Sequence, residues 1–295
     1  MRIVSFLNVI AFIVCVTFTI AYADSNNIYT SNEVSLTSSG ICDNILGQPV
    51  TGTLETYFES GTLKKSTPYK NGKIHGVEKE YYESGTLKAE SSFSNNKYNG
   101  VIKQYDQLGR LHIESNYKDG YQNGVSKLYY KTGGIRQETQ YVGKGLIGNV
   151  KSYYESGELQ VVSTSRKGKT HGVFKTYYKS GQLSQESLYR DGRQYGVSKT
   201  YYKSGQLKEE VLYRVGSEPT VTKVYYETGE LNGEYFFNAD NQLHGISISY
   251  YRSGIIIREI PYTKGKKNGV EKWFAESGQL IRETAYKDGK EVINK

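Results

Sequence analysis

The side chains that could bind a metal or transfer a proton are scattered along this sequence. The four histidines are His75, His112, His171 and His244, and three of them directly precede a glycine that recurs with a fixed period. If each period is one unit of an extended array, His75 and His171 lie about 38 Å apart, because strands are spaced by about 4.8 Å. Histidines this far apart cannot share a metal ion, so we expect no metal site.

The other reactive groups lack the partners that catalysis requires. The glutamates recur opposite lysines, which makes them ion-pair partners and not a clustered acid–base pair with perturbed pKa values. The segment Gly143-Lys144-Gly145 lacks the strand–loop–helix setting of a phosphate-binding loop. Cys42 has no histidine near it in the sequence. We therefore expect no catalytic residue, no cofactor and no enzymatic activity.

A repeat of 24 residues, beginning at Gly52, dominates the sequence. Its consensus is Gly-Val-x-Lys-x-Tyr-Tyr-x-Ser-Gly-x-Leu-x-x-Glu-x-x-Tyr. Each copy has a turn glycine, and these are Gly61, Gly85, Gly109, Gly133, Gly157, Gly181, Gly205, Gly229, Gly254 and Gly278. One step, from Gly229 to Gly254, is 25 residues long. A strict period of this length is typical of a solenoid, in which each unit packs only against its neighbours.

The pattern within each repeat predicts two β-strands. Apolar residues alternate with period two and glycine returns too often for a helix. We expect an all-β fold: an elongated, single-layer antiparallel array of β-hairpins, with ten repeats of about 24 residues over residues 52–295. About twenty strands would extend about 95 Å.

The Ser-Gly dipeptide of each repeat predicts a hairpin turn and sets the strand register. A turn centred on this dipeptide places Lys79 opposite Glu90 and Tyr82 opposite Leu87. The same lysine and glutamate positions recur along the array, so Lys175 should face Glu186 and Lys199 should face Glu210. Opposite charges across strands fix the register, because a slip of one residue would turn every side chain to the other face.

A second turn joins each hairpin to the next. It contains Asn71-Gly72 in the first repeat and Asp119-Gly120 or Asp191-Gly192 later. A two-residue loop keeps the same face upward in successive repeats. The extra residue of the 25-residue step should be absorbed in the loop from Asn238 to Gln242.

The first 51 residues lie outside the repeat. Residues 1–23 combine Arg2, a mostly apolar run and Ala21-Tyr22-Ala23, which predicts a secretory signal cleaved near Ala23. The mature chain should be periplasmic or secreted, and Cys42 would be its one cysteine. Residues 24–51 are rich in Ser and Asn and are expected to form a leader or a cap over the first hairpin.

The chain is moderately basic, with a formal net charge of +8 that cleavage of the signal lowers by one. A basic chain can bind nucleic acid or anionic lipid. Here the lysines alternate with glutamates, so we expect a surface of ion pairs and no nucleic-acid partner.

The repeat resembles the bacterial variant of the MORN repeat, typical of proteins called YwqK-type antitoxins. Residues 172–191 (GVFKTYYKSGQLSQESLYRD) and 196–214 are close matches. The resemblance implies an elongated β-hairpin array that binds a partner protein, commonly a toxin. Because this chain begins with a secretory signal, we expect an exported immunity protein and not a cytoplasmic antitoxin.

The sequence is compatible with two binding functions. The first is neutralisation of a toxin or effector by direct binding, and the second is a secreted or surface scaffold that contacts envelope lipids or host cells. Tyrosine anchors interfaces well for its entropy cost. The candidate partner-binding residues are therefore the tyrosines of the most regular repeats: Tyr177, Tyr178, Tyr201 and Tyr202.

Overall fold

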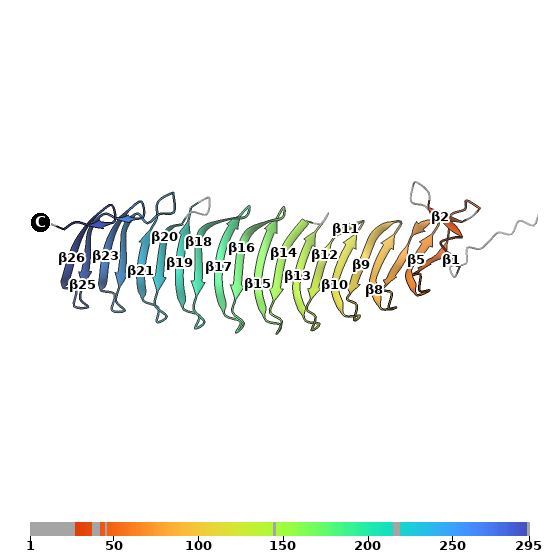
Figure 1. Cartoon of the computed structure of the whole chain (residues 1–295), viewed down its shortest axis with the longest axis horizontal. Coiled ribbons are helices and arrows are strands. Elements are labelled where there is room, and N and C mark those ends of the chain that lie inside the picture. Colours follow the sequence, from red (N-terminus) through yellow and green to blue (C-terminus); the bar gives the residue numbers. More distant parts are fainter. Residues whose placement is uncertain (1–26, 37–41, 45, 144–145, 215–218, 294–295) are drawn as a thin grey trace, which may run out of the picture.

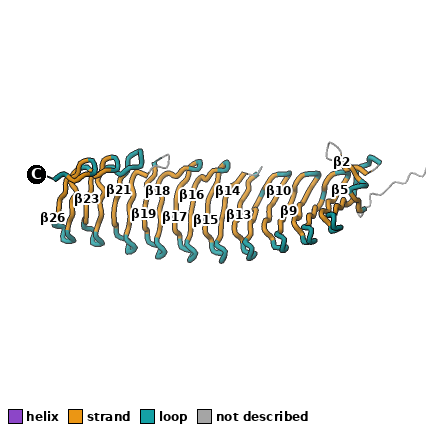
Figure 2. The backbone as a smooth tube through the Cα atoms, viewed as in Figure 1, coloured by secondary structure: helices purple, strands orange, loops and turns teal. Residues whose placement is uncertain are grey.

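The described chain is one long row of strands with no helix (Figures 1 and 2). A computed structural model describes residues 27–36, 42–44, 46–143, 146–214 and 219–293. Within these ranges the fold is a single sheet of 25 strands, accompanied by a separate pair formed by β2 and β3. The expected all-β, single-layer hairpin array is therefore confirmed. No helix of the described residues is long and apolar enough to cross a bilayer.

Ten hairpins follow one another along the sheet within the described residues. Their strands are β4 (Gly52–Tyr57) with β5 (Leu63–Lys70), β7 (Gly76–Tyr81) with β8 (Leu87–Ser94), β9 (Lys97–Tyr105) with β10 (Leu111–Lys118), β12 (Gly124–Tyr129) with β13 (Ile135–Val142), β14 (Leu146–Tyr153) with β15 (Leu159–Arg166), β16 (Lys169–Tyr177) with β17 (Leu183–Arg190), β18 (Arg193–Tyr201) with β19 (Leu207–Tyr213), β20 (Pro219–Tyr225) with β21 (Leu231–Phe236), β22 (Gly245–Tyr250) with β23 (Ile256–Thr263), and β25 (Gly269–Phe274) with β26 (Leu280–Lys287).

Short strands complete the sheet and its first end. They are β1 (Ile28–Thr30), β2 (Val34–Leu36), β3 (Cys42–Asn44), β6 (Lys73–Ile74), β11 (Tyr121–Gln122), β24 (Lys266–Lys267) and β27 (Lys290–Glu291). In Figure 1 the turns within the hairpins form the lower edge of the sheet, and the turns between successive hairpins form the upper edge.

The lower turns differ from the expected symmetric turn. The amide of Tyr82 donates to the carbonyl of Thr86, the amide of Gly85 donates to the carbonyl of Tyr82, and Gly85 has a φ of 82°. This is a type I turn followed by a glycine in the left-handed conformation, which makes a three-residue loop with a β-bulge. Leu87 consequently pairs with Tyr81, and the register shifts by one residue between Tyr81 and Glu80, so that Lys79 still faces Glu90. The expected pairing of Tyr82 with Leu87 is wrong for this reason.

The upper turns agree with the expectation of a two-residue loop. Asn71 and Gly72 have φ of 50° and 73° and lie between the paired residues Lys70 and Lys73, as a type I′ turn requires. In the long repeat the amide of Asn238 donates to the carbonyl of Gln242 across a three-residue loop. The loop from Asn238 to Gln242 therefore absorbs the extra residue, as predicted.

One face of the sheet carries a row of lysine and glutamate, called here the Lys–Glu row, which is interrupted at Ser66, Val162 and Ile248. The predicted pairs Lys79–Glu90, Lys175–Glu186 and Lys199–Glu210 are all opposed in register. Their N···O distances are 3.9, 3.2 and 3.6 Å. Most of the glutamates also face a lysine of the next hairpin, as Glu90 faces Lys103 and Glu210 faces Lys223, whereas Glu234 faces Ile248. The row thus connects hairpins as well as strands within them.

The most buried side chains lie on the opposite face and are mostly small hydroxyl residues. Ser187 and Ser198 are 0% and 5% exposed and share a hydrogen bond of 2.7 Å. The same two positions of other repeats hold further buried hydroxyls: Thr67, Ser115, Thr139, Ser247 and Thr284. A single layer offers no second sheet, so the side chains that become fully covered are short ones overlain by their neighbours.

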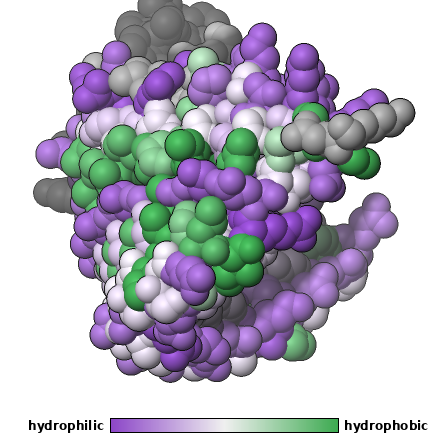
Figure 3. Space-filling view, turned by 90° about the vertical axis from the view of Figure 1, so that its left-hand side faces the viewer, coloured by the Kyte–Doolittle hydropathy of each residue, from purple (hydrophilic) through white to green (hydrophobic). Residues whose placement is uncertain are grey.

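The two ends of the sheet differ. At the first end β1 pairs in parallel with β4, and Val50 and Tyr69 form a small buried cluster with Tyr29 and Val34. The predicted signal, residues 1–23, lies outside the described residues. At the other end the last long strand, β26, leaves Leu280 and Ile281 exposed, and Figure 3 shows hydrophobic groups between hydrophilic ones there.

The Lys–Glu row predicts a charge-reversal experiment. Lys199→Glu would place three carboxylates side by side, because position 199 lies between Glu186 and Glu210. We expect the free energy of unfolding to fall by at most about 1 kcal/mol, since the pairs are exposed. Adding Glu210→Lys should recover part of the loss, because it restores opposite charges at positions 199 and 210. The recovery should be incomplete, because the new lysine would also face Lys223. Urea unfolding measures both changes.

The control for this experiment is Lys203→Glu, which makes the same change of charge in an exposed turn outside the row. If this control lowered stability as much as Lys199→Glu, the row would not set the register.

Candidate interaction surface

Seven repeats carry two adjacent tyrosines, and the two tyrosines have different roles. The hydroxyl of the second tyrosine crosses to the next repeat and donates to the backbone carbonyl of the first aromatic residue there. Seven such bonds, of 2.6–3.1 Å, occur in the described chain, and their donors are Tyr82, Tyr130, Tyr154, Tyr178, Tyr202, Tyr226 and Tyr251. We call this series the tyrosine ladder.

Two of the four candidate partner-binding tyrosines belong to this ladder. Tyr178 donates to the carbonyl of Tyr201 at 2.6 Å, and Tyr202 donates to the carbonyl of Tyr225 at 2.9 Å. All four candidates are half-buried. The structure thus gives Tyr178 and Tyr202 a role in joining repeats, while partner binding by any of the four stays a prediction.

The first tyrosines lie beside the Lys–Glu row. Tyr153 donates to Glu138 at 2.7 Å and Tyr250 donates to Glu234 at 3.0 Å. Burial raises the pKa of each phenol, and the hydrogen bond to the glutamate raises it further, to about 12 for both Tyr153 and Tyr250. These hydroxyls therefore stay protonated at neutral pH and act as donors to the carboxylates.

A buried carboxylate lies in the last hairpin. Glu271 is 2% exposed and accepts hydrogen bonds from Lys267 at 2.6 Å and from the indole Nε1 of Trp273 at 3.0 Å. Arg258 forms an ion pair with it and lies over the Trp273 ring, 4.3 Å from the centroid. Burial alone would raise the pKa of Glu271, but the bonds to Lys267 and Arg258 outweigh burial and hold the pKa below its ordinary value.

The histidines do not gather into a site. His171 lies 3.4 Å from Asp191 at the upper edge, and His75 lines an open cavity of about 420 Å³ beside Thr51 and Tyr69. Among the described residues no group of three or more His, Cys, Asp or Glu could hold a metal ion. The side chain of Cys42 lies outside what the structure describes.

Sequence reasoning did not anticipate a column of exposed apolar residues. The residue after the first glycine of each repeat lies on the same face as the Lys–Glu row, two positions before the lysine, and is usually valine. Several members are 37–51% exposed: Val77, Val101, Val173, Val197, Ile246 and Val270. We call this series the valine column. The signal was present in the consensus Gly-Val-x-Lys, but a valine in a strand is expected to be buried.

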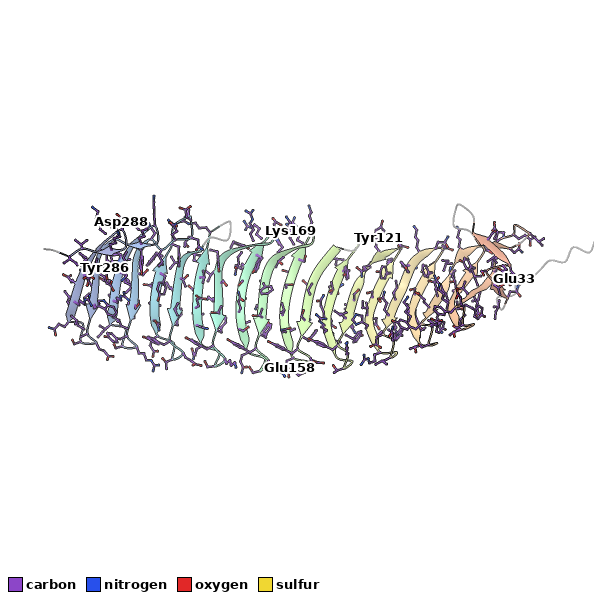
Figure 4. All side chains as sticks on the ribbon, in the orientation of Figure 1. Glu33, Tyr121, Glu158, Lys169, Tyr286 and Asp288 are labelled. Atoms are coloured by element: carbon purple, nitrogen blue, oxygen red, sulfur yellow. The ribbon has the colours of Figure 1, made fainter. Side chains whose placement is uncertain are left out.

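The upper edge gathers positive charge. Figure 4 shows side chains projecting along it, with Lys169 and Tyr121 labelled. Paired cations border several upper turns, as Lys70 faces Lys73 and Arg190 faces Arg193. The excess of basic residues in the sequence is therefore partly concentrated on this edge.

The tyrosine ladder predicts a cost for removing one hydroxyl. Tyr178→Phe leaves the Tyr201 carbonyl without its donor, so we expect a loss of about 1 kcal/mol in the stability of the neighbouring hairpins. Tyr177→Phe is the matched control, because no hydrogen bond of its hydroxyl occurs among the described residues. Hydrogen exchange of the amides in β16–β19 measures the loss, and equal protection in the two variants would contradict a structural role for the ladder.

The buried carboxylate predicts a pH dependence. Since the pKa of Glu271 is lowered in the folded chain, its contribution is fully present above the unfolded-state value of about 4.3 and is lost as pH falls through the folded value. Glu271→Gln should remove this acid dependence. At neutral pH it should cost about 2 kcal/mol, because it leaves Arg258 and Lys267 without their anion.

The measurement is Trp273 fluorescence during unfolding from neutral to acid pH, since this chain has one tryptophan. Glu276→Gln, in the exposed turn of the same hairpin, is the control. A variant at Glu271 that kept the acid transition of the unmodified chain would disprove the assignment.

The comparisons with known proteins agree with the repeat. A family model described as "MORN repeat variant" matches eight segments: residues 50–71, 74–95, 122–142, 146–165, 170–191, 194–214, 243–264 and 267–288. The two repeats without a match form the hairpins β9–β10 and β20–β21, which have the same pairing as the others. No curated protein matches the chain.

Solved structures give only weak likenesses. A crystal structure of TcdB2-TccC3-TEV is 17% identical, with 83% of this chain and 13% of that chain covered and a TM-score of 0.19. A structure of TcdB2-TccC3 without its hypervariable C-terminal region is 15% identical, with 85% and 16% covered and a TM-score of 0.20. This chain spans a small part of those proteins, and TM-scores this low do not indicate a shared fold. The eight family matches cover more than half of the sequence, and the chain therefore belongs to the MORN repeat variant family.

Proposed function

We propose that this chain is a non-catalytic, exported binding protein that neutralises a toxin or effector by covering it. The observation that carries the proposal is the exposed valine column. Ile246 is 51% exposed and Val77 is 48% exposed, and the column recurs along nearly the whole sheet. Apolar side chains aligned on one rigid surface are typical of a protein interface.

The rest of the same face supports this interpretation. The Lys–Glu row is already paired internally, so it supplies a polar rim and few unsatisfied charges. The rings of Tyr177 and Tyr201 lie on this face and can add aromatic contacts. Tyr178 and Tyr202 contribute to binding mainly by fixing the spacing of successive repeats. Residues 1–23 supply the export signal that such a role outside the cytoplasm requires.

A second function has one observation in its favour. The basic upper edge, with pairs such as Arg166 facing Lys169, suits an anionic surface of envelope lipids or host cells. Co-sedimentation with vesicles that contain phosphatidylserine tests this alternative. Binding that disappears in Arg166→Glu with Lys169→Glu would support the surface scaffold.

The proposed function predicts loss of protection when the gene is deleted. Cells without the gene should be killed in co-culture with parental cells that secrete the toxin. A plasmid copy should restore survival only when it encodes residues 1–23, because protection is needed outside the cytoplasm. Colony counts after co-culture measure survival. Unchanged survival, together with no toxin recovered on the purified protein, would exclude the proposed function.

A further inference from the structure

The valine column changes character halfway along the sheet. In the first half the residues paired with it are mostly polar: Ser92, Asn116, Gln140 and Thr164. In the second half the paired residues are Leu188, Leu212, Phe236, Pro261 and Ala285. A single column thereby widens into a two-residue stripe that runs from β16 to β26. We call these five residues, together with the members of the valine column from Val173 to Val270 that pair with them, the C-terminal apolar stripe.

Two hairpins of the stripe are joined directly through β19 and β20, whereas Leu188 of the hairpin before them is paired with Tyr195 and not with Val197. Val197 pairs with Leu212, Leu212 pairs with Val221, and Val221 pairs with Phe236, so four apolar residues follow one another on adjacent strands. Leu212 is 43% exposed and Val197 is 37% exposed. No other segment of the described chain covers this face, because the sheet has one layer.

Cations border the two ends of the stripe on the side of the upper edge, whereas Asn238 and Thr263 hold the corresponding positions between them. Arg190 follows Leu188 by two residues, so alternation places both on one face, and Arg193 is paired with Arg190. The guanidinium of Arg190 lies over the ring of Tyr195, 4.6 Å from its centroid, and Tyr195 is paired with Leu188. Lys287 has the same position relative to Ala285 and faces Lys290.

The other border of the stripe is the Lys–Glu row, where each cation already has an anion. Lys223, for example, lies 3.1 Å from Glu234. One side of the stripe therefore carries more cations than anions, although Asp191, Asp240 and Asp288 also lie in its turns, and the other side is neutral. A partner that fits must combine apolar residues with acidic residues along one flank.

The spacing of the stripe fits a helix better than an extended chain. Apolar residues recur on successive strands, about 4.8 Å apart along the sheet. An α-helix laid along the stripe repeats its apolar face every turn, about 5.4 Å, whereas an extended strand places side chains of one face about 6.7 Å apart. A helix of about 18 residues would span five or six strands.

We propose that the C-terminal apolar stripe binds an amphipathic helix of a partner protein whose apolar face is flanked by acidic residues. The apolar side chains of the helix lie on Val197, Leu212 and Val221, and its carboxylates face Arg190 and the other upper-edge cations. This inference rests on the proposed function as a partner-binding protein and identifies the surface and the chemistry of the partner.

The test uses the full mature chain and two labelled peptides of 18 residues with the same leucine face. One peptide carries glutamates along a flank and the other carries lysines there. Fluorescence anisotropy should show the glutamate peptide binding at least about tenfold more tightly. Val197→Ser with Leu212→Ser, which introduces residues of the type found in the first half, should weaken binding about tenfold. Arg190→Glu with Arg214→Glu should abolish the preference for glutamate.

The matched control is Val77→Ser with Val101→Ser, at two members of the valine column in the first half, which should change the affinity less than about twofold. Equal binding of the two peptides, or equal effects of the two serine pairs, would overturn the proposal. So would a dimer in sedimentation that Val197→Ser with Leu212→Ser converts to a monomer, since a second copy would then cover the stripe.

The co-culture assay separates this proposal from the proposed function. If gene deletion leaves survival unchanged but the peptide results hold, toxin neutralisation fails and the stripe remains a helix-binding surface. If deletion abolishes protection but the Val197→Ser, Leu212→Ser chain protects fully, the stripe proposal fails and the proposed function remains.

Discussion

The constraint on which this structure depends is that a single-layer sheet has no second layer to satisfy its side chains. Side chains that become buried therefore find most of their partners within the sheet itself, on strands about 4.8 Å away. Lys199 lies between Glu186 and Glu210, and the hydroxyl of Tyr178 reaches the carbonyl of Tyr201. Because every repeat is both donor and acceptor for its neighbour, the same residue types must recur at the same positions. The strict period of the sequence is a consequence.

This dependence explains which parts of the structure could be predicted. The Lys–Glu register followed from two columns of opposite charge in the sequence. The extra residue could be placed between Asn238 and Gln242 because the strands on either side must keep the same alternation of faces. The pairing of Tyr82 with Leu87 was wrong because a Ser-Gly dipeptide fits both a two-residue loop and a three-residue loop with a bulge. The two loops differ in backbone conformation at Gly85, which no side-chain pattern reports.

The candidate surface was less accessible to sequence reasoning. Tyrosine was the right residue type to consider, but the acceptor of the Tyr178 and Tyr202 hydroxyls is a backbone carbonyl, which leaves no trace in the sequence. The valine column was visible in the consensus but its exposure was not. A valine two residues before a lysine in a strand is normally covered by another layer, and Val197 is exposed because this fold lacks one.

The same constraint bears on the ends of the sheet. In the middle of the array the most buried column holds hydroxyl residues together with apolar ones such as Ile102 and Val211, and Ser187 bonds to Ser198. Glutamate occupies this column near both ends. Glu78, in the second hairpin, reaches Lys65 at 3.0 Å, and Glu271, in the last, reaches Lys267 and Arg258. The longer glutamate side chain reaches cations of the preceding hairpin, and Glu78 also accepts a hydrogen bond from Thr67, so ion pairs replace the hydroxyl–hydroxyl bond in these two hairpins.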